Sequence, residues 1–126
     1  MIPTRLTEDV AILREQGQDI EIVEESNRFY VILKAFHLPD GTYAPTITDL
    51  MMMADYQFPL SRLDMYWTDP TIYLASGGLP LNANQFEMYA NRRWQRWSWH
   101  YPTWDPSKHN LRTHIEVFRD RLARGN

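Results

Sequence analysis

Four of the five tryptophans fall within residues 94–104, and this cluster restricts the fold more than any other feature of the chain. Side chains alternate between the two faces of an extended segment. In that conformation two sets of side chains face opposite ways: Trp97, Trp99 and Tyr101 on one side, and Arg96, Ser98 and His100 on the other. The aromatic set then packs inward, and a hydroxyl and an imidazole become neighbours on the polar face. The stretch is therefore the first candidate for a functional site.

Size and composition restrict the class of protein. A chain of 126 residues with 44% hydrophobic residues is long and apolar enough for one folded domain, which we expect to span residues 1–126. No apolar run approaches the roughly 20 residues of a membrane span, and the amino terminus lacks the pattern of a secretory signal, so we expect a cytoplasmic protein without a membrane partner. The absence of cysteine excludes disulfides, thiolate zinc sites and thiol nucleophiles.

Hydrophobic spacing predicts a helix at each end of the chain and strands between them. Leu6, Val10 and Leu13 recur at helical intervals, and Gly17 can end that helix. Four runs have strand character: 19–23, 28–36, 47–56 and 62–67. Residues 68–91 are predicted to be mostly irregular, and a second helix is predicted from Ser107 or Asn110 to Ala123, with an apolar stripe formed by Leu111, Ile115, Phe118 and Leu122.

These elements predict an α+β fold in which an antiparallel four-stranded meander is flanked by amino-terminal and carboxyl-terminal helices. Met51, Met52 and Met53 fall in the third strand. They could form a soft binding surface, but core packing is the interpretation we favour.

The element order is similar to that of the ubiquitin-conjugating-enzyme fold. Residues 56–60, Tyr-Gln-Phe-Pro-Leu, resemble the tyrosine-proline turn before that family's fourth strand, and residues 104–106, Trp-Asp-Pro, resemble its tryptophan-x-proline element. Residues 58–68, 93–100 and 111–114 look like the recurring motifs of a bacterial branch of ubiquitin-conjugating-like proteins. The resemblance implies that a ubiquitin-like protein is received from an adenylating activating enzyme and passed to an amine of a target protein. It also raises antiviral defence as the role of the pathway.

The chain departs from the family at the nucleophile. The family's usual cysteine precedes the tryptophan-x-proline element, and by position Ser98 is the nearest hydroxyl, six residues before Trp104. The family's histidine-proline-asparagine element is missing, but Asn91 lies at about the right offset. The resemblance therefore implies a serine oxyester at Ser98, with the Asn91 amide or backbone amides as donors to the oxyanion.

A serine hydroxyl needs a positioned base, and imidazole is the natural one near neutral pH. His100 lies two residues after Ser98. In a strand both side chains share a face, with roughly 6–7 Å between their α-carbons. We therefore predict Ser98 as acyl acceptor and His100 as its base or proton shuttle. The alternative is that both belong only to the polar face of a strand or loop, in a catalytically inactive binding module for the ubiquitin-like protein or its activating enzyme.

Other kinds of site have weaker support in the sequence. The arginines and tryptophans of residues 92–97 could bind single-stranded nucleic acid, but the net charge of −3 argues against it and arginine stacked on core tryptophan explains the same residues. Sugar binding on exposed tryptophan has similarly little support. His100, His109 and His114 lack a recognised metal-ligand spacing, and His114, beside the apolar stripe of the last helix, is better explained as a packed residue. We expect no metal and no cofactor.

Overall fold

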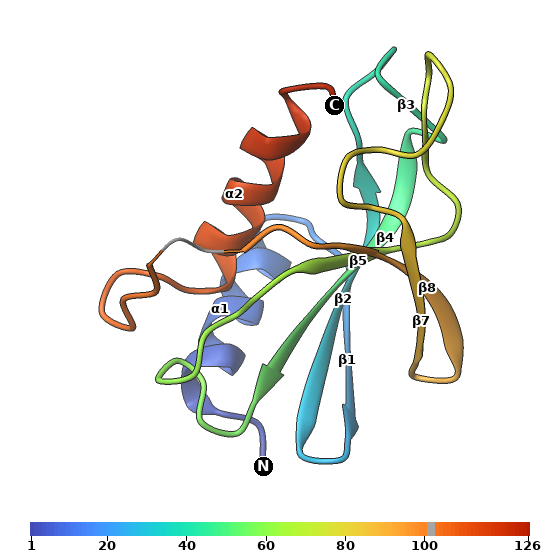
Figure 1. Cartoon of the computed structure of the whole chain (residues 1–126). Helices are drawn as coiled ribbons and strands as arrows, with labels where there is room; N and C mark the ends of the chain where they lie inside the picture. The colour runs from blue at the N-terminus through green and yellow to red at the C-terminus, as the bar shows by residue number, and fades with distance from the viewer. Residues whose placement is uncertain (101–102) are drawn as a thin grey trace.

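The computed structural model describes residues 1–100 and 103–126, and in it the helices lie beside the main sheet (Figure 1). The helices are α1 (Thr4–Glu15) and α2 (Leu111–Leu122). In chain order the strands are β1 (Ile20–Glu25), β2 (Arg28–His37), β3 (Tyr43–Ala44), β4 (Ile47–Asp55), β5 (Tyr66–Thr68), β6 (Tyr73–Leu74), β7 (Gln85–Tyr89) and β8 (Arg92–Trp97). No helix in the described part of the chain is long and apolar enough to cross a membrane. The fold is α+β.

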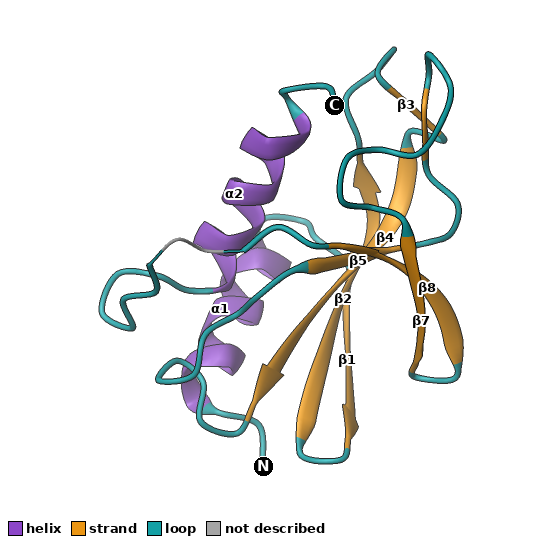
Figure 2. Cartoon of the chain, in the orientation of Figure 1, coloured by secondary structure: helices purple, strands orange, loops and turns teal. Residues whose placement is uncertain are grey.

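The main sheet has six strands in the order β1-β2-β4-β5-β8-β7, and every neighbouring pair is antiparallel (Figure 2). β3 and β6 form a separate two-stranded ribbon. The predicted four-stranded sheet is therefore too small, because the hairpin of β7 and β8 continues it beyond β5. The predicted fourth strand, 62–67, is also displaced, since β5 begins only at Tyr66.

The β7–β8 hairpin corrects the prediction that residues 68–91 are mostly irregular. Its two-residue turn is Ala90-Asn91, and both residues have positive φ, 51° and 59°. Such turns match the twist of a hairpin, and Asn-Gly is their usual sequence signal. Ala-Asn is a weaker signal, so the turn gives little indication that residues 85–89 form a strand.

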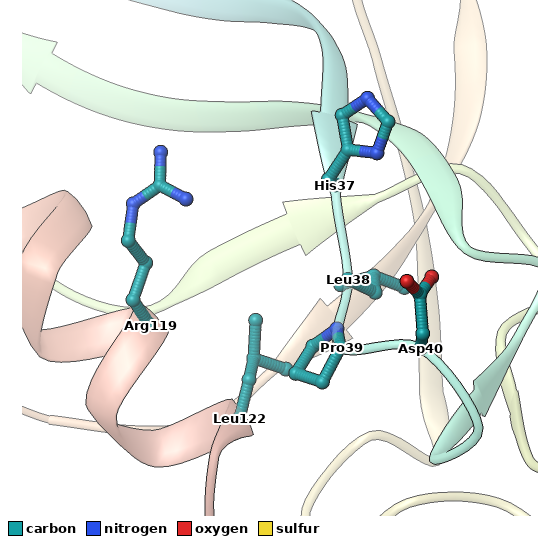
Figure 3. A pocket seen from close by; sticks show the side chains of 6 residues that line it. All are labelled: His37, Leu38, Pro39, Asp40, Arg119 and Leu122. Atoms are coloured by element: carbon teal, nitrogen blue, oxygen red, sulfur yellow. The ribbon is translucent and has the colours of Figure 1, made fainter.

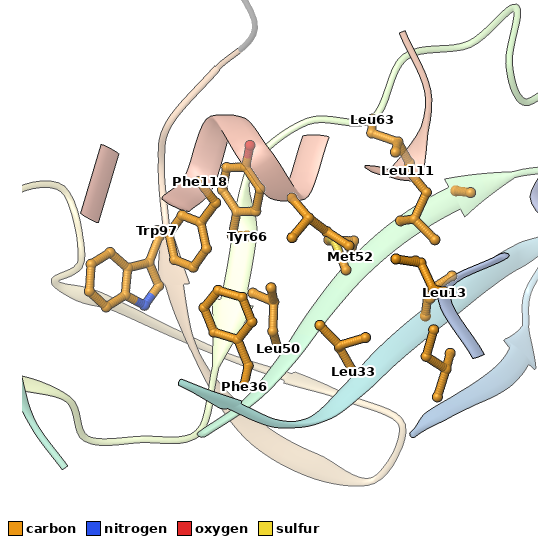
Figure 4. Close-up of a cluster of buried hydrophobic side chains, with 14 of the residues drawn as sticks. Leu13, Leu33, Phe36, Leu50, Met52, Leu63, Tyr66, Trp97, Leu111 and Phe118 are labelled. Atoms are coloured by element: carbon orange, nitrogen blue, oxygen red, sulfur yellow. The ribbon is translucent and has the colours of Figure 1, made fainter. Parts of the chain in front are cut away.

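Both helices cover the same face of the sheet (Figure 1). Their apolar stripes are buried as the spacing predicts: Leu6, Val10 and Leu13 in α1, and Leu111, Ile115, Phe118 and Leu122 in α2. In Figure 4 the rings of Tyr66 and Trp97 lie beside Phe118, with centroid distances of 4.2 and 5.4 Å. The predicted helices are therefore confirmed, and the core lies between them and the sheet.

The start of α2 is fixed by two polar side chains. Asn110 accepts a hydrogen bond from the Thr113 amide at 3.0 Å, and the Thr113 hydroxyl accepts one from the Asn110 amide at 2.8 Å. Asp9 of α1 accepts from the Leu111 amide at 3.1 Å. Burial raises the pKa of Asp9, and the hydrogen bond from Leu111 acts in the opposite direction. These contacts join the two helices at one end.

The face of the sheet opposite the helices carries a second cluster. It consists of Tyr30, Ile32, Met51, Trp67 and Trp94, all buried. Met52, the neighbour of Met51, points to the helix side. Met51 and Met52 have exposed fractions of 0%, and Met53 is partly buried against the second cluster, so core packing is confirmed for the first two and partial for the third.

The connection between β5 and β7 is held to the sheet by the side-chain amide of Gln95 in β8. Its Oε1 accepts from the Ile72 amide at 2.7 Å, and its Nε2 donates to the carbonyls of Ile72 at 3.1 Å and Ala83 at 2.9 Å. All three residues have exposed fractions of 0%. One side-chain amide thus provides hydrogen bonds to three backbone groups that lie outside the main sheet and are buried from solvent.

His114 of α2 is a core residue. Its ring stacks on Tyr66 at a centroid distance of 4.2 Å, and Nε2 lies 3.0 Å from the carbonyl oxygen of Met65. Because that oxygen can only accept, Nε2 carries the proton. Burial lowers the pKa of His114 from 6.5 to about 4. The predicted packed role is confirmed.

His114 should make the stability of the fold depend on pH. The unfolded chain binds a proton at His114 below about pH 6.5, whereas the folded chain resists it until about pH 4. The free energy of unfolding should therefore fall as pH decreases through this window, by about 3 kcal/mol from this residue. Urea unfolding at pH 7.5 and pH 4.5 measures the fall, and His114→Gln should reduce it. Equal pH dependence in the two proteins would contradict the assignment.

Candidate functional site

The segment after β8 does not continue the strand. β8 ends at Trp97, whose side chain is buried and donates from Nε1 to the Thr68 hydroxyl at 2.9 Å. The Ser98 amide donates to the Asn82 carbonyl, and the Trp99 amide donates back to the Trp97 carbonyl, both at 2.9 Å. The chain therefore turns at Ser98. The predicted alternation holds as far as Trp99, because Trp99 packs against the same core as Trp97 and Ser98 contacts Arg96. The segment is nevertheless not a strand after Trp97, and Tyr101 lies outside the described residues.

Ser98 accepts a hydrogen bond from a charged group. Arg96 Nε donates to Ser98 Oγ at 3.1 Å, and Arg96 Nη1 donates to Glu87 Oε2 at 2.9 Å. The other oxygen of Glu87 accepts from Trp67 Nε1 at 2.9 Å. This chain of contacts fixes the guanidinium beside a half-buried hydroxyl. A cation in that position stabilises negative charge on the oxygen, although it cannot remove the proton.

His100 is paired with Asp64 and not with Ser98. Its Nδ1 lies 2.9 and 3.0 Å from the two carboxylate oxygens of Asp64. Among the hydrogen bonds of the described residues, none joins His100 to Ser98. Because the carboxylate accepts from Nδ1–H, the neutral ring has its lone pair on Nε2. The prediction that His100 is the base of Ser98 is therefore not supported by the contacts, but the pair has the arrangement of an oriented general base.

Asn91 lies at the wrong end of β8 for its predicted role. It is in the β7–β8 turn, before the strand begins, whereas Ser98 follows the strand. Seven residues of extended chain separate the two by about 23 Å. Asn91 is therefore not a donor to an oxyanion at Ser98. The prediction rested on the family's sequence offset, and that offset does not account for the extended chain of β8 between the two residues.

Sequence reasoning did not assign the partners of these residues. Asp64 precedes β5 and lies 36 positions before His100, so no local pattern joins the two. Arg96 was placed only on a polar face with Ser98. Nothing in the sequence indicated that Glu87 contacts Arg96, because that contact depends on the β7–β8 register. In this register Gln85 pairs with Arg96, and Glu87 pairs with Trp94.

The two motifs that resemble ubiquitin-conjugating enzymes meet in space. Trp104 Nε1 donates to the Pro59 carbonyl at 2.8 Å, and the rings of Trp104 and Phe58 are 6.3 Å apart. The tryptophan-x-proline element thus packs on the turn before β5. The family model described as Prokaryotic E2 family E matches residues 5–125. The chain belongs to this family.

Membership of prokaryotic E2 family E confirms the resemblance to bacterial ubiquitin-conjugating-like proteins. No curated protein and no solved structure gives a significant match to the chain. The chain has no cysteine, so the usual nucleophile of the wider ubiquitin-conjugating family is absent from this E2-like protein. Any acyl carrier in it must use oxygen or nitrogen.

The other candidates from the sequence are occupied within the fold. The guanidinium of Arg92 lies 4.0 Å from the ring centroid of Trp94 and pairs with Asp49 and Asp69. Trp94 and Trp97 are buried, so their rings cannot stack on bases. This supports internal arginine stacking as the explanation of residues 92–97.

The three histidines considered as metal ligands have separate partners. His100 contacts Asp64, His109 Nδ1 accepts from the Asp105 amide at 2.8 Å, and His114 is enclosed in the core. Within residues 1–100 and 103–126, no group of three or more metal-ligating side chains of the His, Cys, Asp and Glu types comes together.

Proposed function

We propose that this E2-family protein carries a ubiquitin-like protein as an oxyester on Ser98 and transfers it to an amine of a target protein. The acyl group would come from an adenylating activating enzyme. Family membership supports a place in such a pathway. The contact between Arg96 Nε and Ser98 Oγ is the observation that favours Ser98 as the acceptor, because a fixed cation lies against the hydroxyl that the resemblance aligns with the family's nucleophile.

The first step forms the ester. Ser98 Oγ attacks the carboxyl-terminal carbonyl carbon of the ubiquitin-like protein, the bond from that carbon to the activating group breaks, and the hydroxyl proton is released to solvent. As the oxygen develops negative charge, the guanidinium of Arg96 stabilises it. Glu87 holds the guanidinium in place at 2.9 Å. By stabilising negative charge on the serine oxygen, the Arg96 guanidinium thus partly compensates for the absence of a cysteine thiolate.

The second step transfers the acyl group. A target amine attacks the ester carbonyl, the new N–C bond forms and the C–Oγ bond breaks, and Ser98 regains a proton. The amine must lose a proton to become a neutral amide. His100 Nε2, oriented by Asp64 on Nδ1, is suited to accept it. His100 is exposed enough, at 59% of its side chain, to meet an incoming protein.

The test of this function is a conjugation assay that compares Arg96→Ala with Arg93→Ala. If Arg96 stabilises the developing charge, its removal should slow conjugate formation by about 10²–10³-fold. Arg93, also on β8, lies over Phe86 at 4.4 Å from the ring centroid and does not touch Ser98. Arg93→Ala should therefore keep the wild-type rate. Equal rates in all three proteins would contradict the role of Arg96.

A second prediction concerns the histidine pair. His100→Gln should slow discharge of a preformed ester onto an amine by about 10²-fold or more, because general base catalysis is lost. Formation of the ester should be far less affected. Rapid quenching of the two half-reactions separates them. Loss of ester formation with unchanged discharge would assign His100 to the first step.

One observation favours a different function, a binding module that arranges transfer performed elsewhere. His100, two residues after Ser98, is engaged by Asp64, and among the described residues the Ser98 hydroxyl has a hydrogen bond from a cation and none to a base. In that case the domain would dock the ubiquitin-like protein or its activating enzyme without a covalent intermediate. The Arg96 and Ser98 variants would then retain both conjugation and partner binding.

A further inference from the structure

A cavity of about 390 Å³ lies between the segment after β8 and the second half of α2. Trp99 and His100 line it from the segment, and α2 contributes Val117, Asp120 and Arg121, with Arg124 just beyond the helix. Its volume falls within the range of about 300–1,000 Å³ that is usual for small-molecule sites. The reaction steps proposed above use only one of its residues, His100.

Arg121 lines this cavity and has a hydrogen-bond donor, Nε, without an acceptor among the described residues. Its guanidinium carbon lies 3.5 Å from the ring centroid of Trp99. Stacking holds the plane of the guanidinium fixed and leaves its N–H donors at the edge. Arg121 Nε is buried and has no hydrogen-bond partner within residues 1–100 and 103–126. A buried donor without an acceptor is costly, so an acceptor supplied by a ligand would stabilise the site.

The charges around the cavity select the kind of acceptor. Arg121 and Arg124 oppose one carboxylate, Asp120, so the lining carries one net positive charge when His100 is neutral. Trp99 and Val117 provide apolar walls. A carboxylate matches this single charge and binds a guanidinium through two parallel hydrogen bonds. A phosphate monoester, with a charge of about −1.5 to −2 at neutral pH, matches it less well.

We propose that this cavity binds a carboxylate carried by a partner chain, with Arg121 as the two-point donor and Trp99 as the supporting surface. The carboxylate can belong to a main-chain carboxyl terminus or to an acidic side chain. Because His100 lines the cavity, such a partner would be held beside the His100–Asp64 pair. The proposal does not depend on ester formation at Ser98.

A second cavity gives no comparable argument. The cavity in Figure 3, of about 290 Å³, is lined by His37, Asp40 and Arg119 among others. Arg119 already lies 3.3 Å from Glu116 and covers the ring of Phe36 at 4.7 Å. Arg119 therefore provides the matched control, an arginine of the same helix that lines a different cavity.

The test is a titration of the full chain, followed by ¹H–¹⁵N NMR at the Trp99 indole and the His100 and Arg121 amides. N-acetylglycine and N-acetylglutamic acid α-amide represent the two sources of carboxylate, and the stronger binder identifies the source. N-acetylglycinamide is the neutral control. We expect saturable shifts with a Kd of about 1–10 mM for at least one carboxylate, and none for the neutral amide.

Arg121→Lys keeps the charge and removes the two-point geometry, so it should weaken carboxylate binding by about tenfold. Arg119→Lys should bind like the wild type. The proposal is overturned if no carboxylate gives saturable shifts, if the neutral amide gives the same shifts, if inorganic phosphate binds more tightly than either carboxylate, or if Arg121→Lys binds unchanged. None of these measurements needs the ubiquitin-like protein, so their failure is separate from failure of the proposed function.

Discussion

Ser98→Ala is expected to abolish conjugate formation, with a loss of at least about 10⁴-fold in rate, because the substitution removes the only atom that carries the acyl group. Binding of the ubiquitin-like protein and of the activating enzyme should remain, since the Ser98 side chain contacts only Arg96 among the hydrogen bonds of the described residues. Conjugates counted over time and affinities measured by calorimetry give the two readouts.

Two further variants sharpen this prediction. Ser98→Cys should retain conjugation through a thioester, which reacts with amines faster than an oxyester does. Ser107→Ala removes an exposed hydroxyl that donates to Asp105 at 2.7 Å and should have no effect. Conjugation by Ser98→Ala at the wild-type rate would contradict the carrier function and favour the alternative, a binding module.

Gln95→Leu is expected to cause the largest loss of stability outside the apolar core, at about 3 kcal/mol or more. The substitution keeps the approximate side-chain volume but removes three hydrogen bonds. These are the bonds from Gln95 to the Ile72 amide, the Ile72 carbonyl and the Ala83 carbonyl. Each buried polar group left unsatisfied costs about 1–3 kcal/mol. The free energy of unfolding in urea measures the loss.

The location of the damage can also be predicted. Hydrogen exchange should accelerate first in residues 69–84, because Gln95 ties this connection to the sheet. Gln85→Leu on the exposed edge strand β7 is the matched control and should change stability by less than about 0.5 kcal/mol. A small, evenly distributed effect of Gln95→Leu would show that the connection is held by other contacts.

Local spacing was sufficient to predict the helices and the first three long strands. Leu6, Val10 and Leu13 repeat at the helical period, and residues 28–36 form an apolar run long enough for a central strand. Strand β7 was not predicted, because the turn that follows it, Ala90-Asn91, lacks glycine. The extent of the domain, residues 1–126, stays a prediction.

The site was predictable only as a region. The roles of Ser98 and His100 stay predictions, and the structure adds contacts that the sequence did not indicate. Arg96 is held by Glu87 across the β7–β8 pair, and Asp64 reaches His100 from a residue 36 positions earlier. Contacts of this kind depend on register and on the turn at Ser98, which no local pattern contains. The error at Asn91 has a different cause: its role was taken from the family's sequence offset, and the extended chain of β8 separates it from Ser98.

The most direct test of the carrier function is the intact mass of this protein after incubation with the activating enzyme, ATP and the ubiquitin-like partner. The account predicts an added mass equal to the partner less one water, removed by hydroxylamine and absent from Ser98→Ala. A protein that binds its partner stably and gains no covalent mass would contradict the account.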